Sequence, residues 1–556
     1  MIKNIFTFTI ISVLLFCGCG IKKKRENFQN NLVLSVSGDP KSFNPIIAKE
    51  TSTTAITRFL FEGLIETDGL TLEIKPSLAK SWKVDKNGKK WRFFLRQDVK
   101  WHDGKDFTAD DVIFTFNNLI YNPDIPTSSR DIFSIEGKPI KVTKIDTYTV
   151  EFELPEKFAP FLRLLGHEIL PKHKLENSVE KGIFNSSWGV NEKPENIVGT
   201  GPFFLKEYIP AEWVILDKNP LYWKTDTTST RLPYLDRIVL FILADTNIAL
   251  LKFKVGEIDL VNVRGQDYPL LKPYEEKNNF KLFELGPSLG SEFITLNQNS
   301  TSPLPEHKKK WFQNRNFRQS VAYAIDKESI IRNVYGGFGA NQDGPMNVSC
   351  GFFYNSNLTK YEFNINKSKE LLKREGFFWK NGNLFDNKEN PVEFTILTNS
   401  NNFERVQLAS IIQNDLEQLG MKINLLPIEF NTLVTKLNVT KDWESVIIGL
   451  TGGIEPHNGK NVWHSKGQLH LWNMGVETPK DWEKRLDRIF EDGAKLLDEQ
   501  DRKNLYDEWQ HIVNRELPVI YTASPLSMTA VRNKFGNIKP SVYGGVIHNI
   551  EEIYVK

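Results

Sequence analysis

The sequence predicts an α/β fold because two strand patterns flank a helix pattern between residues 392 and 428. "VEFTIL" (392–397) alternates polar and apolar residues, and "MKINLLPI" (421–428) is a second strand pattern. The stretch between them, 402–420, has helical spacing and ends at Gly420. Its predicted inward face consists of Val406, Ala409, Leu416 and Leu419. This order predicts two parallel strands joined by a right-handed crossover.

A third strand is predicted at "WESVIIGL" (443–450), in the same sheet. A glycine turn and a Glu-Pro pair, "TGGIEPH" (451–457), follow its carboxyl end. Ligands of open α/β sheets bind outside the carboxyl ends of the strands. The turn is therefore a candidate ligand site.

Strand and helix patterns also occur in the rest of the chain. Strands are predicted within 32–45, 89–104 and 147–155. Thr108 and Asp111 predict a capping box at the start of a helix. Two further helices are predicted within 314–335, the first with Asn316 as its N-cap and the second with Asp326.

The length and net charge of the chain limit the number of domains and the classes of function that are expected. The 556 residues allow two to four domains, and 71 basic against 69 acidic residues give a net charge of +2. Nucleic-acid binding is not expected from so balanced a chain. No long apolar run follows the N-terminus, so no second membrane span is predicted.

The N-terminus carries an export signal. "IFTFTIISVLLF" (5–16) is a short apolar core of the kind found in signal peptides. Gly18 before Cys19 resembles a bacterial lipoprotein signal, although Phe16 and Cys17 depart from its usual Leu and small residue. We predict cleavage after residue 18 and lipidation of Cys19. The alternatives are plain secretion or an uncleaved anchor.

No catalytic motif is visible, so an enzyme is not expected. Gly452-Gly453 with Gly459-Lys460 fails as a phosphate loop because Asn461 stands where Ser or Thr is needed. The lone Cys350 beyond the lipidated residue cannot form an internal disulfide. No cofactor is predicted.

Histidines and tryptophans follow the glycine turn. The spacing of His457, His464 and His470 does not place them on one helical face, so we interpret them as surface or loop histidines and predict no metal site. The alternative is that one of them contacts a metal complex carried as cargo. Trp463 and Trp472 are candidates for stacking on a ligand, and core packing is the alternative.

Four segments in order carry a family resemblance. They are "DPKSFNP" (39–45), "LAKSWKVDKNGKKWRFFLRQDVKWHDGKDFTADDVIFTF" (78–116), "VGTGPFFLKEYIPAEWVILDKNPLYW" (198–223) and "NRNFRQSVAYAIDKESIIRNVYGG" (314–337). Together they resemble bacterial extracellular solute-binding proteins of family 5, the peptide, oligopeptide and nickel group that serves ABC importers. The resemblance implies an α/β fold of the two-lobed, periplasmic-binding-protein-like type II, with an extra third domain.

The resemblance also implies the domain boundaries, with the lobes joined by crossing segments near 292–298 and 517–524. The expected units are a lipoprotein signal peptide (1–18), a tether (19–31), lobe I (32–54, 191–298 and 519–556), an extra domain (55–190) and lobe II (299–518). The cations of the tether are expected against anionic lipid or simply in solvent.

In peptide-binding members, the segment matching 446–456 pairs with the peptide backbone and supplies an aspartate for the amino terminus. Gly453 stands at that aspartate position here, and Leu450 replaces the usual tryptophan. Asp39 or Glu455 is then a candidate to bind a cation of the ligand. Arg405 is a candidate to bind a carboxylate, and the alternative is that it is an exposed helix arginine. The predicted ligand-binding residues are Gly38, Asp39, Lys41, Arg405, Leu450, Thr451, Gly452, Gly453, Glu455 and Trp463.

The resemblance implies a monomeric, lipid-anchored substrate-binding protein in the bacterial cell envelope, facing the periplasm or the exterior. It would capture peptides between its lobes and deliver them to membrane permease subunits. The alternatives are a nickel chelate or a sugar as cargo, a secreted hydrolase, and an adhesin or sensor with the same fold.

Overall fold

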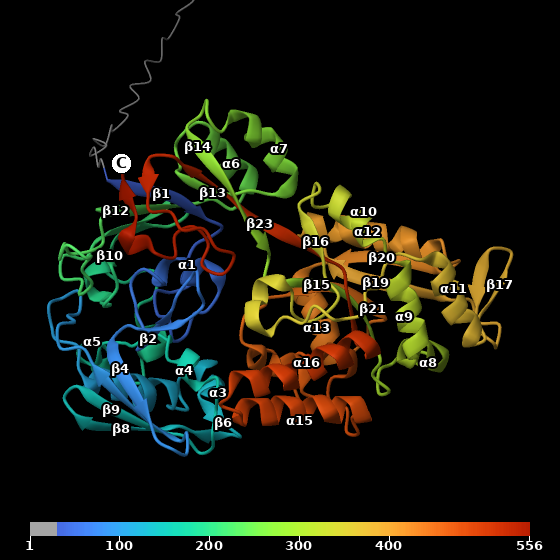
Figure 1. The fold of residues 1–556 in the computed structure, drawn as a ribbon, viewed down its shortest axis with the longest axis horizontal. Helices are drawn as coiled ribbons and strands as arrows, with labels where there is room; N and C mark the ends of the chain where they lie inside the picture. Colours follow the sequence, from blue (N-terminus) through green and yellow to red (C-terminus); the bar gives the residue numbers. More distant parts are fainter. Residues whose placement is uncertain (1–29) are drawn as a thin grey trace, which may run out of the picture.

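The computed structural model describes residues 30–556. The predicted signal peptide, Cys19 and the tether up to residue 29 lie outside the described residues. Within the described part, the elements form two lobes and a third unit, and the domain boundaries given above stay a prediction (Figure 1). No helix in residues 30–556 is both long and apolar enough to cross a membrane.

Lobe I contains two sheets. The first has the order β1-β12-β11-β10, in which β1 is parallel to β12 and the other pairs are antiparallel. The second is β13-β23-β14, with helices α6 and α7 beside it. Leu32, Leu34 and Val36 of β1 are buried, as their alternation predicts. The bounds are β1 Asn31–Val36, β10 Phe203–Ile209, β11 Trp213–Lys218, β12 Arg237–Ile242, β13 Leu260–Asn262, β14 Phe280–Pro287, β23 Ala523–Arg532, α6 Thr246–Lys254 and α7 Tyr268–Leu271.

The extra domain is built on the antiparallel sheet β4-β5-β9-β8. Thr108 and Asp111 form the predicted capping box at the start of α2. One apolar cluster runs from this sheet into lobe I, so the two units share a core. The bounds are β4 Ala79–Val84, β5 Lys90–Leu95, β8 Lys141–Asp146, β9 Thr149–Glu153, α2 Ala109–Ile113 and α5 Lys172–Glu180.

Lobe II is built on the sheet β20-β19-β21-β15-β22. β15 and β22 fall within the bounds predicted for lobe I (191–298 and 519–556), but their pairing places both strands in the sheet of lobe II. β19 is parallel to both β20 and β21, and α12 makes the crossover, so the predicted strand–helix–strand unit is confirmed. The strands are β15 Ser291–Leu296, β19 Glu393–Asn399, β20 Lys422–Ile428, β21 Ser445–Leu450 and β22 Val519–Tyr521. The helices include α8 Glu306–Gln313, α9 Arg315–Ala324, α10 Lys327–Asn333, α11 Ile365–Arg374, α12 Phe403–Glu417, α14 Lys460–Trp463, α15 Asp481–Lys495 and α16 Glu499–Glu516.

Two local expectations are corrected. Asn314, not Asn316, caps α9, because the helix begins at Arg315 and the Asn314 side chain accepts from Phe317 N. On α12 the buried face includes Leu408 and Ile412, whereas Val406 is only half-buried. Asp326 caps α10 as predicted.

Two neighbouring connections join the lobes. β14 continues into β15 through residues 288–290, and β22 continues into β23. β14 pairs with β23 and β15 pairs with β22, all antiparallel, so the two connections run side by side. This ribbon crosses between the sheet of lobe II and the second sheet of lobe I (Figure 1).

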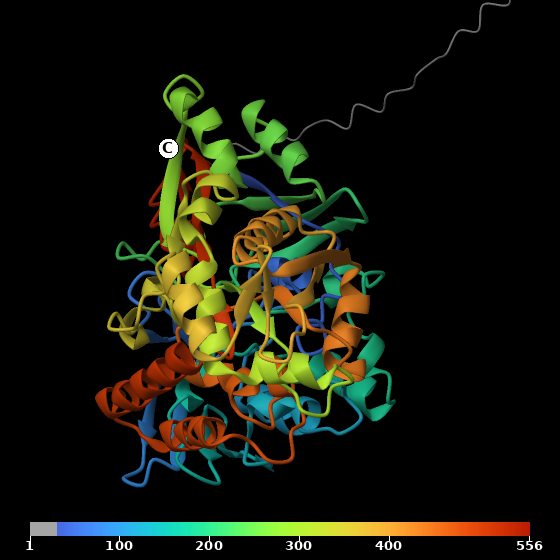
Figure 2. The ribbon, with the colours of Figure 1, turned by 90° about the vertical axis from the view of Figure 1, so that its right-hand side faces the viewer.

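Lobe II also touches the extra domain, on the side away from the crossing strands (Figures 1 and 2). Ala159 N donates to Ala494 O over 2.7 Å. Lys495 lies 3.0 Å from Glu136 and 3.1 Å from Glu156. Lobe II is therefore joined to lobe I at the crossing strands and also contacts the extra domain at the end of α15.

Candidate ligand-binding site

The glycine turn leaves the carboxyl end of β21 and packs on the crossing segment. A Cβ at Gly452 would lie 1.7 Å from the carbonyl oxygen of Leu289, so only glycine allows this close approach. A Cβ at Gly453 would have Asn458 Nδ2 as its nearest neighbour, at 3.9 Å. Packing therefore requires the first glycine and leaves room for a side chain at the second.

The backbone of this turn is free to pair. Thr451 and Gly452 are exposed and Gly453 is half-buried. Within residues 30–556, the N–H and C=O groups of 451–453 make no hydrogen bond to the protein. Leu450, one residue earlier, is still in register with Ser291 of β15.

The predicted lobe I residues follow β1. A Cβ at Gly38 would meet nothing within 4 Å, so this position is open. The Asp39 carboxylate accepts from Tyr208 Oη (2.8 Å) and from Ala211 N (2.9 Å), both within its own lobe. Lys41 N donates to Glu50 Oε1 over 3.2 Å and to Thr53 Oγ1 over 3.1 Å. The backbone of Lys41 is thus engaged, and Asp39 already has partners.

Arg405 is held by its own lobe. Its Nε and Nη2 each donate to the Glu292 carboxylate over 2.7 Å, and Nη1 donates to Asn399 Oδ1 over 2.6 Å. The Arg405 side chain is only 12% exposed. The interpretation as an exposed helix arginine is wrong, and the carboxylate that it holds here is Glu292.

Glu455 is likewise taken up inside lobe II. It forms an ion pair with Arg502, and both side chains are only 5% exposed. It also accepts from His457 N over 3.1 Å. The Arg502 guanidinium lies over the rings of Phe353 and Tyr506, at 5.3 and 5.6 Å. The expectation that this carboxylate meets a ligand cation has no support in these contacts, because its charge is already compensated.

Trp463 belongs to the core. It is buried, and its ring lies 5.5 Å from both Trp472 and Trp509. Trp472 is also buried, and its Nε1 donates to Glu483 over 3.0 Å. Of the two interpretations, core packing describes both side chains.

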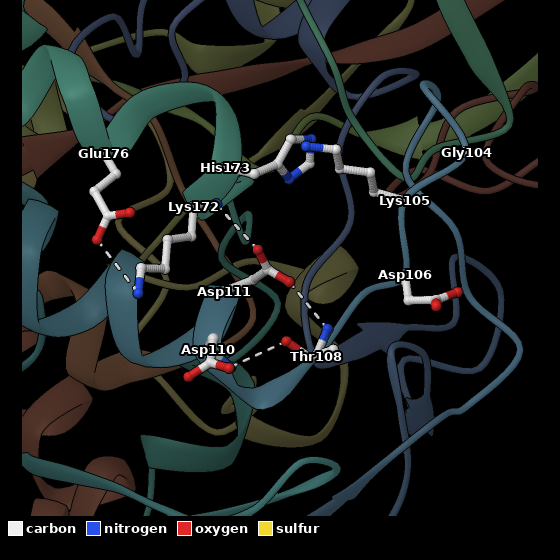
Figure 3. Close-up of a pocket in the computed structure, with 9 residues that line it drawn as sticks. All are labelled: Gly104, Lys105, Asp106, Thr108, Asp110, Asp111, Lys172, His173 and Glu176. Atoms are coloured by element: carbon white, nitrogen blue, oxygen red, sulfur yellow. Dashed lines mark hydrogen bonds and ion pairs between the residues drawn. The ribbon is translucent and has the colours of Figure 1, made fainter.

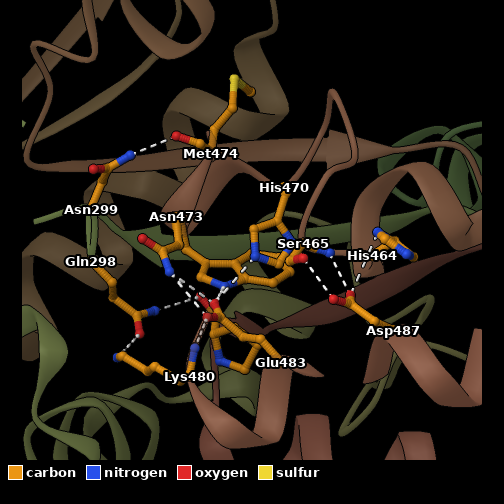
Figure 4. A network of polar contacts seen from close by, with 12 residues as sticks. Gln298, Asn299, His464, Ser465, His470, Asn473, Met474, Lys480, Glu483 and Asp487 are labelled. Atoms are coloured by element: carbon orange, nitrogen blue, oxygen red, sulfur yellow. Dashed lines mark hydrogen bonds and ion pairs between the residues drawn. The ribbon is translucent and has the colours of Figure 1, made fainter. Parts of the chain in front are cut away.

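The three histidines have separate partners. His470 is fully buried, with Nδ1 3.0 Å from Val462 O and Nε2 3.2 Å from Glu483 (Figure 4). His464 lies 3.3 Å from Glu491, and His457 packs on Phe158. His470 therefore lies in a loop, as one of the two interpretations has it, but it is buried rather than at the surface, and a buried carboxylate satisfies its ring.

No group of three or more His, Cys, Asp or Glu residues placed to hold a metal ion occurs within residues 30–556. A cavity of the extra domain lies between residues 104–111 and 172–176 (Figure 3). Lys172 and Glu176 of its lining pair with each other over 3.3 Å, and Asp106 and Asp110 pair with Lys100 and Lys144 outside it. None of the predicted ligand-binding residues lines it.

Sequence reasoning missed Glu292 and Asn399. Both lie at strand ends next to the glycine turn, on β15 and β19. The available signal was a lone carboxylate in the otherwise uncharged "EFITL" of a predicted crossing segment. Pairing it with Arg405 requires both the register of β15 against β21 and the packing of α12 beside these strands, which sequence spacing does not supply.

The family described as "Bacterial extracellular solute-binding proteins, family 5 Middle" matches residues 73–468 of the 556. The chain belongs to this family of solute-binding proteins, and its fold is that of a type II periplasmic binding protein. Its relatives are binding proteins of transporters, not enzymes.

Three comparisons show the range of these relatives. A probable ABC transporter-binding protein of Deinococcus radiodurans is 28% identical over 515 residues, which cover 87% of this chain and 85% of that protein. The oligopeptide-binding protein AppA of Bacillus subtilis, solved with a nonapeptide, has a TM-score of 0.73 and 26% identity, covering 95% of this chain and 99% of AppA. NikZ of Campylobacter jejuni, solved with Ni(L-His), has a TM-score of 0.76 and 25% identity, covering 94% and 99%.

Proposed function

We propose that this protein is the substrate-binding lipoprotein of an ABC importer, which captures peptides between its lobes and delivers them to a membrane permease. Family membership supports the binding role. The oligopeptide-binding protein AppA and the nickel–histidine complex of NikZ mark the two cargo classes to be separated by experiment.

The free backbone of residues 451–453 is the observation that carries the peptide proposal. These residues extend a central strand of lobe II and keep their N–H and C=O groups unpaired within the described residues. An extended peptide can pair with such groups as an added strand, which gives affinity without requiring particular side chains. The open position at Gly38, after β1, supports a second backbone contact from lobe I.

Recognition of a charged amino terminus is not part of the proposal. Gly453 supplies no carboxylate, and Asp39 and Glu455 are engaged within their own lobes. Because a buried unpaired carboxylate is costly, the site that lacks one suits a ligand that presents no cation there.

The lobes are proposed to close about the two crossing connections. Hinge motions concentrate dihedral changes in a few residues between rigid elements. Residues 288–290 between β14 and β15 are such a short connection, and the glycine turn rests directly on it through Gly452. This close packing supports a proposed ligand contact at the turn that lies next to the proposed hinge.

Mass spectrometry of ligand released from purified protein lacking residues 1–19 tests the cargo. A mixture of peptides is the expected result. A single metal complex or a sugar would overturn peptide import while leaving the family assignment intact.

The lipid anchor has a test of its own. Cys19→Ser is expected to abolish labelling by a palmitate analogue, and Cys350→Ser, which alters a buried thiol, is the matched control that keeps it. Persistent labelling of Cys19→Ser would exclude Cys19 as the sole lipidation site.

A further inference from the structure

An internal carboxylate already neutralises the arginine at the edge of the candidate site. The Glu292 side chain accepts two hydrogen bonds of 2.7 Å from Arg405 in a bidentate pair. Bidentate arginine–carboxylate pairs are among the stronger side-chain interactions because both hydrogen bonds are charge-assisted. Any anionic group that approaches Arg405 therefore competes with Glu292.

The surrounding backbone is shaped to hold this pair. Glu292 and Gly449 are partners across the β15–β21 ladder. A Cβ at Gly449 would lie 2.4 Å from Glu292 Oε1 and 2.6 Å from Arg405 Nη2, so a larger residue would push into the pair. Asn399 accepts from the third nitrogen of Arg405, and Asn402 caps the helix that carries it.

The pair lies where the two lobes face each other. The neighbouring Glu404 has a raised pKa, chiefly through burial, and it also interacts with Arg264 and Asp267 of lobe I. The Glu292 side chain keeps 23% of its surface exposed, and that of Arg405 keeps 12%. A ligand between the lobes can thus reach the pair, and its charge decides whether the pair stays closed.

We propose that Glu292 is a specificity-determining residue, an internal counter-ion that makes this position select ligand segments without a free carboxylate. A ligand carboxylate would have to separate Arg405 from Glu292 and leave Glu292 part-buried without a partner, whereas an uncharged segment leaves the pair intact. Together with the missing carboxylate at Gly453, the site then fits the interior of a peptide chain, or a capped or amidated end. This inference rests on the proposed function and names the ligand class for it.

Two N-acetylated tetra-alanine peptides, one with a free carboxyl end and one with an amide, test the inference by calorimetric titration of the full chain. The unaltered protein is expected to bind both within about twofold. Glu292→Gln frees Arg405 and is expected to bind the free acid roughly tenfold tighter than the amide. Glu393→Gln removes a carboxylate at the opposite end of the same sheet and is the matched control, with the ratio unchanged.

The outcomes separate this inference from the proposed function. An unchanged acid-to-amide ratio in Glu292→Gln, or a strong preference for the free acid in the unaltered protein, overturns the counter-ion role. If neither peptide binds to any variant, the proposal of peptide binding is rejected. The role of Glu292 is then tested with two smaller probes, propionate and propionamide. Propionate, but not propionamide, is expected to raise the thermal midpoint of Glu292→Gln and to leave the unaltered protein unchanged. An equal rise in both proteins overturns the inference.

Discussion

The ring of Phe158 in the extra domain meets the imidazole of His457 in lobe II edge-on, with ring centroids 5.2 Å apart and planes at 81°. The ring of Phe490 of α15 also lies near the imidazole, with its centroid at 6.4 Å. Burial, with the nearby cations Lys460 and Arg502, lowers the pKa of His457 to about 3. The Arg502 charge is itself paired with Glu455. A neutral histidine thus lies in the contact between lobe II and the extra domain.

Acid is expected to weaken this contact through His457. Its pKa in the folded protein lies below the ordinary 6.5, so the unfolded chain takes up the proton first as pH falls. The free energy of unfolding is unaffected above about pH 6.5 and declines between there and about pH 3. At about pH 5 the loss from this group is about 2 kcal/mol.

Urea unfolding at neutral pH and near pH 5 measures that loss. His457→Gln cannot take up the proton and is expected to lose about 2 kcal/mol less on acidification than the unaltered protein. His511→Gln, on the exposed face of α16, is the control and should lose as much as the unaltered protein. Equal losses in His457→Gln and the control would show that His457 is not buried neutral.

Removing Arg502 is expected to be strongly destabilising. Arg502→Met leaves the Glu455 carboxylate buried without its counter-ion, at a cost of about 3–5 kcal/mol in the free energy of unfolding. Adding Glu455→Gln should recover part of the loss, because the unpaired charge is then gone. Arg485→Met breaks an exposed pair with Glu508 and serves as control, with a change of about 1 kcal/mol or less. Denaturant titration of the four proteins decides the point, and similar losses for the two arginine variants would contradict it.

The ion pairs of Lys495 are expected to contribute little. Its side chain and those of Glu136 and Glu156 are 40–50% exposed, so solvent and salt screen the attraction. Lys495→Ala should leave the thermal midpoint almost unchanged, and any difference should vanish in high salt. A large, salt-independent loss would mean that this end of α15 is desolvated more deeply than the structure shows.

The two glycines of the turn are expected to respond differently to substitution. Gly452→Ala forces a Cβ against the Leu289 carbonyl and should cost about 1–3 kcal/mol. Gly453→Ala fits in open space and should change stability by less than about 0.5 kcal/mol. Gly453→Trp should fold but block ligand binding, as read by calorimetry with the recovered ligand. Unchanged affinity in Gly453→Trp would place the ligand elsewhere.

Much of the fold could be read from local pattern. The alternation of Leu32, Leu34 and Val36 and the crossover between β19 and β20 follow from apolar periodicity, which depends on residues close in sequence. The predicted cap at Asn316 was wrong by two residues, because a sequence pattern locates a helix end only to within a residue or two and the cap geometry decides the exact position. Side-chain roles at the site were harder to predict, as Glu455 and Trp463 show, since both turned out to be satisfied inside lobe II.

The sequence by itself determined the family, the parallel strands of lobe II and the placement of a glycine turn at the end of a central strand. Only the tertiary structure decided that Arg405 is neutralised by Glu292, from a strand more than a hundred residues earlier in the chain. The reason is physical: backbone propensity and apolar period act over a few residues, whereas charge compensation depends on which strands lie side by side. The position of the glycine turn can therefore be predicted from sequence, whereas the charge of the ligand group that the site prefers depends on Glu292 of the neighbouring strand.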